Sequence, residues 1–208
     1  MRGVLITFEG VEGSGKSTQI RRLERWLRDE GYRPETTSEP DGTELGVAVR
    51  RLFERRPRPL AETFLFMAAR HQHVVEKIGP WLRAGRIVLC DRYTDATVAY
   101  QGYGSGVDRE LIRELNVRAT GGVLPDLTLL FDLDPTIGVR RIGGRRRLDR
   151  FEREKLAFHR RVRRGYLEVM RAEPKRVRRL DAAASPAEVE QNVREIVNEF
   201  FAQGGPRR

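Results

Sequence analysis

The sequence predicts an α/β protein in which a parallel sheet of about five strands is covered by helices on both faces. Two features of the chain predict this fold class. Apolar runs of strand length alternate with helical patterns, and a glycine-rich loop lies between the first run and the first helix. Strands buried on both faces read as continuous apolar runs, and their alternation with helices builds a parallel sheet. The 208 residues suit one domain, 1–208.

The elements follow from these patterns in chain order. The apolar runs that we interpret as strands cover residues 4–8, 86–90 and 127–133, with a weaker run at 176–180. Gly31 supplies a stop for the first helix, and Ser185 followed by Pro186 is a typical start for the last one. The expected helices run from Lys16 to Gly31, from about Leu60 to Leu82, and from Pro186 to about Phe201.

The composition is that of a globular chain with a highly charged surface, because 39% of residues are hydrophobic and 34% are charged. No apolar run reaches the roughly 18 residues that a membrane helix needs, and the first residues carry no export pattern. The single cysteine, Cys90, lies in an apolar run and cannot form an internal disulfide. We therefore expect a cytoplasmic protein that does not bind membranes.

The glycine-rich loop, residues 10–17, matches the phosphate-binding pattern G-x-x-x-x-G-K-S between a strand and a helix. Its backbone amides and the positive end of the following helix suit phosphate oxygens. Lys16 is expected to act as a catalytic residue at the β and γ phosphates, and Ser17 to offer its hydroxyl to Mg²⁺. A purely regulatory nucleotide switch is an alternative. The expected ATP and phosphate contacts are Gly10, Val11, Glu12, Gly13, Ser14, Gly15, Lys16, Ser17 and Thr18.

The formal net charge of +10 is concentrated in one segment. Residues 140–164 contain twelve Lys or Arg and three acidic residues, a local net of +9. Because the excess is local and the chain carries a phosphate loop, we interpret the segment as a clamp on nucleotide phosphates rather than a nucleic-acid surface. A nucleotide-gated nucleic-acid binder is the alternative from a different functional class.

Two further groups of residues lie where a second ligand could bind beside the phosphate loop. Asp91 and Arg92 directly follow a predicted strand, so they emerge at the carboxyl edge of the sheet, where open α/β folds bind ligands. Phe66 and Arg70 are four residues apart on a predicted helix and project from one face. The second pair alone is equally compatible with a packed phenylalanine beside a solvated arginine.

Four segments, together with the loop, resemble the bacterial type of thymidylate kinase over nearly the whole chain. The resemblance implies a P-loop NTPase three-layer sandwich that phosphorylates dTMP to dTDP with ATP in dTTP synthesis. It further implies a Mg²⁺ cofactor, ATP and dTMP as substrates, and a homodimer. A kinase for another nucleotide or nucleoside is the alternative within this fold. The segments are SEPDGT at 38–43, LFMAARHQH at 65–73, DRY with YQG at 91–93 and 100–102, and LDRFE at 148–152.

The resemblance also implies roles for individual acceptor-site residues. Arg92 would hold the acceptor 5′-phosphate as a catalytic residue, and Asp91 would orient the Mg²⁺ shell. Phe66 would stack on thymine while Arg70 donates to its exocyclic oxygen. The other dTMP contacts would come from Glu12 at the sugar 3′-hydroxyl, Tyr100 beneath the sugar, and Thr97 and Gln101.

Residues from about 140 to 152 correspond to the family's arginine-rich lid. Six arginines between 140 and 150 surround two glycines, so we expect a segment that moves when no anion is bound. In the bacterial type the catalytic arginine comes from this lid, since the phosphate loop has glycine at the position of Gly13. Arg150 is the expected catalytic arginine, and Arg145 is the expected supporting contact to ATP. No general base is needed, because the second pKa of the acceptor phosphate is about 6.

The chain departs from the family pattern in one segment. The family usually has arginine before Glu-Pro and two glycines after it, whereas here Ser38 and Asp41 replace one residue of each kind. If that arginine touches the acceptor phosphate, another basic residue must replace its contact or the acceptor affinity is lower.

Overall fold

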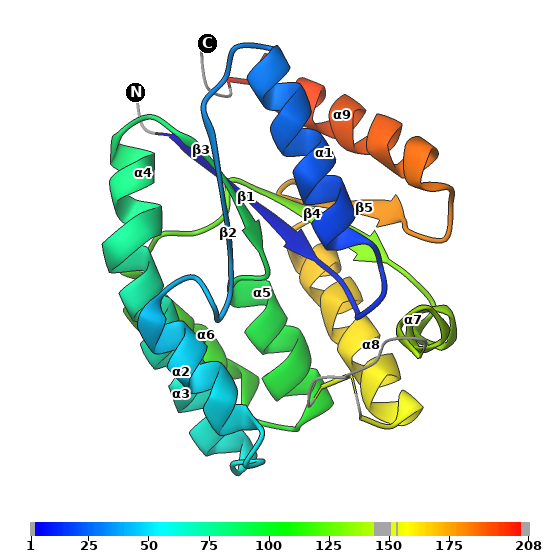
Figure 1. Ribbon diagram of the computed structural model, residues 1–208. Coiled ribbons are helices and arrows are strands. Elements are labelled where there is room, and N and C mark those ends of the chain that lie inside the picture. Colours follow the sequence, from blue (N-terminus) through cyan, green and yellow to red (C-terminus); the bar gives the residue numbers. More distant parts are fainter. Residues whose placement is uncertain (1–2, 144–150, 153, 205–208) are drawn as a thin grey trace.

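The computed structural model describes residues 3–143, 151–152 and 154–204, and in this part of the chain five strands form one parallel sheet (Figure 1). Neighbouring strands are parallel throughout, and β1 lies at the centre with β3 and β4 on either side. The order across the sheet is β2-β3-β1-β4-β5. The strands are β1 (Val4–Glu9), β2 (Pro34–Ser38), β3 (Ile87–Asp91), β4 (Leu127–Asp132) and β5 (Val177–Asp181). The predicted α/β fold class is confirmed.

Four strands lie within a residue or two of the predicted runs, but β2 has no counterpart among them. Its sequence, PETTS, lacks an apolar run because β2 is an edge strand that pairs only with β3. Pro34, which cannot donate to the ladder, is its first residue, a position where a strand tolerates proline. The strand matters for function because it delivers Ser38 and Glu39 to the carboxyl edge of the sheet.

The helices agree with the prediction where the prediction was specific. The expected helix from Leu60 to Leu82 is a continuous run of α3, η1 and α4, in which η1 is a π-helix just before Pro80. Proline removes one intrahelical hydrogen bond, and the wider turn accommodates that loss. Ser185 and Glu188 form a capping box at the start of α9. The helices are α1 (Lys16–Asp29), α2 (Glu44–Phe53), α3 (Pro59–His73), η1 (Val74–Ile78), α4 (Gly79–Arg83), α5 (Thr94–Thr97), η2 (Val98–Gly104), α6 (Arg109–Thr120), α7 (Pro135–Ile142), α8 (Leu156–Ala172) and α9 (Pro186–Ala202).

Helices cover both faces of the sheet, which gives three layers. Helices α1 and α9 pack together on one face, while α8 packs against η2 on the other (Figure 1). Alternate strand residues divide between two clusters, because Leu5 packs with Ile78 whereas its neighbour Ile6 belongs to the cluster that contains Leu23. No helix among the described residues has the length and apolarity required to cross a membrane.

Parallel pairing brings the functional segments to one edge. Phe8 is in register with Asp91, so the chain leaves β1 and β3 at the same level. The phosphate loop and residues 91–93 therefore begin side by side at the carboxyl ends of the two strands, in the crevice where α/β sheets bind ligands.

Candidate active site

The loop between β1 and α1 folds around the side chain of Lys16. Gly15 has φ +89° and forms the N-terminal cap of α1. The Lys16 ammonium donates to the carbonyls of Gly10 and Val11 at 3.0 and 3.1 Å. Burial, with the charge of Arg92, lowers the pKa of Lys16 to about 8. The loop thus presents a buried cation at the N-terminus of a helix, an arrangement that suits a polyphosphate.

Gly13 is the loop position that packs closely against α7. Its φ is +73°, and a Cβ there would lie 2.5 Å from the carbonyl oxygen of Gly138 in α7. At Gly15, which also has a positive φ, a Cβ would meet nothing within 4 Å. The structure therefore explains why position 13 carries glycine: a side chain there would push α7 away from the loop.

We expect Gly13→Ala to lower both the melting temperature and kcat more than Gly15→Ala does. Both substitutions pay backbone strain, but only the first adds a clash with backbone atoms, at a cost of roughly 1–3 kcal/mol. For a chain of this length that difference corresponds to about 3–10 °C in Tm. Thermal unfolding of the two variants measures it, and equal shifts would show that the contact with α7 is unimportant.

Ser17 and Asp91, the predicted metal residues, are hydrogen-bonded to each other. The Ser17 hydroxyl donates to Asp91 Oδ2 at 2.9 Å. Asp91 Oδ1 is buried and lacks a hydrogen-bond partner among the described residues. The pair fits Mg²⁺, which prefers oxygen ligands and keeps several waters. The described part of the chain contains no group of three or more His, Cys, Asp or Glu that could hold a metal ion, so phosphate oxygens would have to complete the coordination.

Arg92 adopts a backbone conformation that is rare for a residue with a side chain. Its φ is +68°, in the left-handed region. The next amide, Tyr93 N–H, donates to the buried carboxylate of Glu9 at 2.7 Å and fixes this turn. The Arg92 guanidinium lies 4.7 Å from the centroid of the Tyr100 ring and donates to Glu12 Oε1 at 2.9 Å. Such strain is typical of functional sites, where the surrounding structure stabilises it.

Glu12 is the buried acid at the centre of the site. Its Oε1 also accepts from the Tyr100 hydroxyl at 2.6 Å, and His159 Nδ1 lies 3.3 Å from Oε2. Burial acts to raise the pKa of Glu12, but Arg92, His159, Tyr100 and Lys16 together hold that pKa well below its ordinary value. Glu12 is therefore an ionised carboxylate inside the protein. No pattern in the chain indicated that His159 lies here, because it is 147 positions from Glu12 along the sequence.

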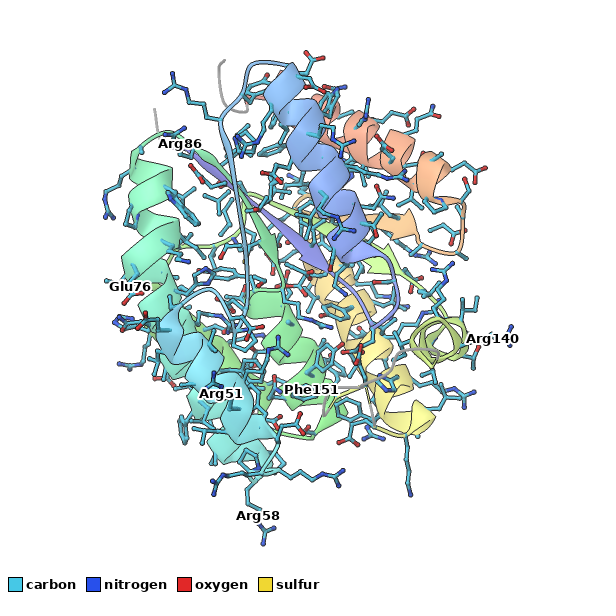
Figure 2. All side chains as sticks on the ribbon, viewed as in Figure 1. Arg51, Arg58, Glu76, Arg86, Arg140 and Phe151 are labelled. Carbon is cyan, nitrogen blue, oxygen red and sulfur yellow. The ribbon has the colours of Figure 1, made fainter. Side chains whose placement is uncertain are left out.

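All seven residues that were predicted to contact dTMP line one pocket. Its aromatic wall consists of Phe53, Phe66, Tyr100 and Phe151, with ring centroids 4.4 Å apart for Phe53 and Phe66 and 5.6 Å for Tyr100 and Phe151. Phe151 is labelled in Figure 2, where it lies between α2 and α8. The seven predicted residues are Glu12, Phe66, Arg70, Arg92, Thr97, Tyr100 and Gln101.

A second pocket, the phosphate pocket, adjoins the aromatic one. It is lined by the loop from Glu12 to Thr18 and by Asp91. Four residues belong to both pockets and mark the place where they meet: Glu12, Glu39, Arg50 and Arg92. A donor polyphosphate in one pocket would thus face an acceptor in the other across two guanidinium groups.

Arg70 is buried rather than solvated, so the packing alternative for this residue is wrong. Only 1% of it is exposed, and Nε and Nη2 donate to Glu39 Oε2 at 2.8 and 2.7 Å. Burial acts to raise the pKa of Glu39, yet the Arg70 charge and His73 hold that pKa below its ordinary value. The pair remains ionised in the interior because each charge is compensated by hydrogen bonds.

Several side chains of the site were not predicted from the sequence. Arg50 and Phe53 come from α2, and Arg50 Nε lies 2.6 Å from the carboxylate of Asp41. The two residues are three apart on a helix and project together, a signal that recognising α2 would have supplied. Arg50 is also a basic residue close to Ser38, where the family usually carries arginine.

The expected lid residues Arg145 and Arg150 lie outside the described residues. Arg140 and Arg141, at the start of the predicted lid, belong to the last turn of α7. Arg141 donates to the carbonyls of Gly13 and Ala182 at 3.3 and 2.9 Å. Helix α7 therefore connects the phosphate loop to the beginning of the arginine-rich segment.

A parallel sheet with this loop after its central strand, and an acceptor pocket beside it, defines a P-loop kinase. The family model described as thymidylate kinase matches residues 8–193, and the chain belongs to this family. A thymidylate kinase of Desulfovibrio desulfuricans is 46% identical in an alignment 213 residues long that covers 97% of this chain and 98% of the relative. One from a Synechococcus strain is 50% identical over 188 residues, covering 89% and 90%. The crystal structure of thymidylate kinase from Ehrlichia chaffeensis superposes with a TM-score of 0.77 at 34% identity and covers 95% of this chain and 99% of its own.

Proposed function

We propose that the protein transfers the γ-phosphoryl group of ATP to dTMP and forms dTDP, a step of dTTP synthesis. The observation that carries the proposal is the junction of the two pockets at Glu12, Glu39, Arg50 and Arg92. The phosphate loop lies on one side of this junction, and an aromatic pocket suited to a nucleobase lies on the other. The two guanidinium groups therefore lie where the donor and acceptor phosphates would meet. Family membership supports the same reaction.

Catalysis then consists of positioning and charge compensation. Lys16 and the loop amides bind the donor phosphates. Ser17 and Asp91 would help to hold Mg²⁺, which would supply positive charge to offset the charge of those phosphates. Arg92 binds the acceptor phosphate, which is largely ionised at neutral pH because its second pKa is about 6. Its oxygen attacks without a general base, so the site needs no catalytic histidine.

The aromatic pocket would recognise the nucleoside. Phe66 stacks on the base, and Arg70 offers a hydrogen bond to a base carbonyl. Tyr100, which is only 4% exposed, would lie beneath the sugar, where a ribose 2′-hydroxyl would clash with its ring. Glu12 accepts from the sugar 3′-hydroxyl. Arg150, with Arg145 as support, would supply the charge that stabilises the transferring phosphoryl, and the reaction would take place in the cytoplasm.

An acceptor panel tests this proposal. With ATP and Mg²⁺, dTMP is expected to give the highest kcat/KM among dTMP, dUMP, dCMP, dAMP, dGMP and their ribose counterparts. A coupled assay for ADP measures all of them under the same conditions. A clear preference for another acceptor would refute the assignment of the base, and no turnover with any of them would refute the kinase. In the latter case a salt-dependent mobility shift on DNA tests the nucleic-acid alternative.

We further propose a homodimer formed through neighbouring helices on one side of the molecule. Helices α2, α3 and α6 lie side by side (Figure 1) and expose several large apolar side chains. Phe64 of α3 is 50% exposed, and Val75 of η1 is 57% exposed. Contiguous exposed apolar side chains mark interaction surfaces. The other members of this apolar face are Leu45, Val47 and Leu52 of α2, Leu60 of α3 and Val117 of α6.

Phe64→Glu is expected to convert the dimer into a monomer, because it places a charge within the apolar face. Light scattering coupled to size-exclusion chromatography at micromolar concentration measures the mass. Val139→Glu is the matched control, since Val139 is 36% exposed on α7, which lies apart from α2 and α3 in Figure 1. A wild-type protein that elutes as a monomer would contradict the proposed dimer, and a dimeric Phe64→Glu variant would contradict this interface.

A further inference from the structure

The buried guanidinium of Arg70 has nearly all of its hydrogen-bonding capacity occupied by the protein. A guanidinium carries five N–H donors and no acceptor. Nε–H donates to Glu39, and the two Nη2 hydrogens reach Glu39 and the Tyr93 carbonyl, the latter at 2.9 Å. On Nη1, one hydrogen goes to Asn116 Oδ1 at 2.5 Å. Among the described residues, the partner of the remaining Nη1 hydrogen is the Met67 sulfur, 3.9 Å away, a weak acceptor.

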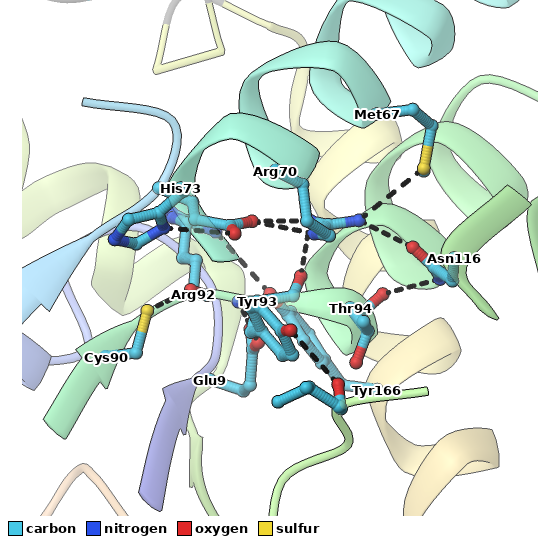
Figure 3. Close-up of polar contacts among 12 residues, drawn as sticks. Glu9, Met67, Arg70, His73, Cys90, Arg92, Tyr93, Thr94, Asn116 and Tyr166 are labelled. Carbon is cyan, nitrogen blue, oxygen red and sulfur yellow. Dashed lines mark hydrogen bonds and ion pairs between the residues drawn. The ribbon is translucent and has the colours of Figure 1, made fainter. Parts of the chain in front are cut away.

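Asn116 comes from α6, an element that contributes no residue to either pocket of the active site. Its side chain is 5% exposed, and its Nδ2 donates to the Thr94 carbonyl at 3.3 Å. The orientation of the amide follows from its partners: a guanidinium only donates and a carbonyl only accepts, so Oδ1 must face Arg70 and Nδ2 must face Thr94. Figure 3 shows Met67 and Asn116 together at the Nη1 end of Arg70.

We infer that Asn116 is a positioning residue that sets base specificity, because it fixes Arg70 so that a single Nη1–H remains for the nucleobase. This inference rests on the proposed function, since it concerns the base of the acceptor. Arg70 lines the aromatic pocket, while Glu39, Tyr93 and Asn116 prevent its guanidinium from rotating. A base can bind the remaining Nη1–H only through a hydrogen-bond acceptor. In doing so, the base would replace the weak contact of that N–H with the Met67 sulfur.

Nη1 of Arg70 can only donate a hydrogen bond, so it can distinguish pyrimidines by the group that they carry at position 4. Thymine and uracil present a carbonyl oxygen at position 4, which accepts from Nη1–H. Cytosine presents an amino group there, and two donors would face each other in a buried pocket. A polar pocket rejects an analogue that leaves its buried groups unpaired far more strongly than an apolar pocket rejects a small size change. Rejection requires that Arg70 cannot turn away and that no water can intervene. Asn116 contributes to the first condition through its bond to Nη1, and to the second because its buried side chain occupies the space beside Nη1.

Asn116→Ala should therefore weaken discrimination rather than chemistry. The vacated space lets a water molecule accept from both Arg70 and a cytosine amino group. We expect the ratio of kcat/KM for dTMP over dCMP to fall at least about tenfold, the equivalent of losing one charge-assisted hydrogen bond. The loss should lie mainly in the KM for dTMP and in a gain with dCMP, while kcat with dTMP changes less than about threefold, since the phosphate-binding residues are untouched.

Two other variants separate specificity from folding. Asn116→Asp keeps an acceptor for Arg70 and is expected to retain the wild-type ratio within about threefold, although it loses the bond to Thr94. Asn198→Ala, an exposed asparagine of α9, controls for a general effect and should leave the ratio unchanged. If Asn116→Ala does not fold, Asn116→Ser replaces it, because the shorter side chain does not reach Arg70.

The outcomes distinguish this inference from the proposed function. A wild-type enzyme without preference for dTMP would refute the assigned base before any variant is measured. A wild-type preference that persists in Asn116→Ala, or that is lost equally in Asn116→Asp, would refute only the role of Asn116. Equal losses of kcat/KM for dTMP and dCMP would reduce Asn116 to a structural residue.

Discussion

Lys16→Ala is expected to reduce kcat roughly a thousandfold, the scale seen when a preorganised group that stabilises the transferring phosphoryl is removed. Lys16 Nζ is held at the loop by the carbonyls of Gly10 and Val11, and only 7% of the residue is exposed. In such a site a cation stabilises the negative charge of the transition state more strongly than it would in water, because no solvent has to reorganise around that charge. The measurement is steady-state turnover at saturating ATP, Mg²⁺ and dTMP.

Two comparisons make the Lys16 result specific. Lys175→Ala removes an exposed lysine after α8 and should leave kcat unchanged. The wild-type pH profile offers a test without mutation, because the pKa of Lys16 is lowered to about 8 by burial and by Arg92. If the protonated amine is required, kcat/KM for ATP, which reports the free enzyme, falls as the pH rises above about 8. A profile that stays flat to pH 10 would show that the charge of Lys16 is not what catalysis uses.

The sequence predicted the parts of the fold that carry strong local patterns. The central strands and the first and last helices were found because they are apolar on both faces or capped by recognisable residues. Strand β2 escaped because an edge strand with the sequence PETTS buries little, and its position depends on pairing with β3. Local patterns do not encode which strand a polar segment will join.

The site was predictable in the same uneven way. Residues within motifs, such as Arg92 and Tyr100, were found because their spacing from the loop is distinctive. His159 and Asn116 were not, since each acts on a residue far away in the sequence and its own neighbours give no signal. Such supporting residues become visible only when tertiary structure brings a buried polar group to its partner.

Arg92→Ala is expected to lower kcat/KM for dTMP by roughly a thousandfold, mostly through the acceptor phosphate. Arg92 lies at the junction of the two pockets, and its guanidinium is held by Glu12 and the face of Tyr100. A guanidinium can bind phosphate through two parallel hydrogen bonds, whereas the ammonium of lysine cannot. Arg92→Lys should therefore have a kcat/KM of only about one tenth to one hundredth of the wild-type value. KM for ATP should change much less, since the proposed donor contacts, Lys16 and the loop, are unchanged in this variant.

Because the backbone of Arg92 is strained, two substitutions at this position can separate the role of its side chain in catalysis from its effect on stability. At φ +68° any side chain is strained, so Arg92→Gly relieves the strain that Arg92→Ala retains. Removing the guanidinium also leaves the buried Glu12 with only Tyr100, His159 and Lys16 to offset its burial, and the pKa of Glu12 should rise toward its ordinary value. We expect both variants to be equally inactive and Arg92→Gly to melt at the higher temperature. Wild-type turnover in either variant would mean that the acceptor phosphate is held elsewhere, and Arg50, the other guanidinium shared by the two pockets, would be the residue to test.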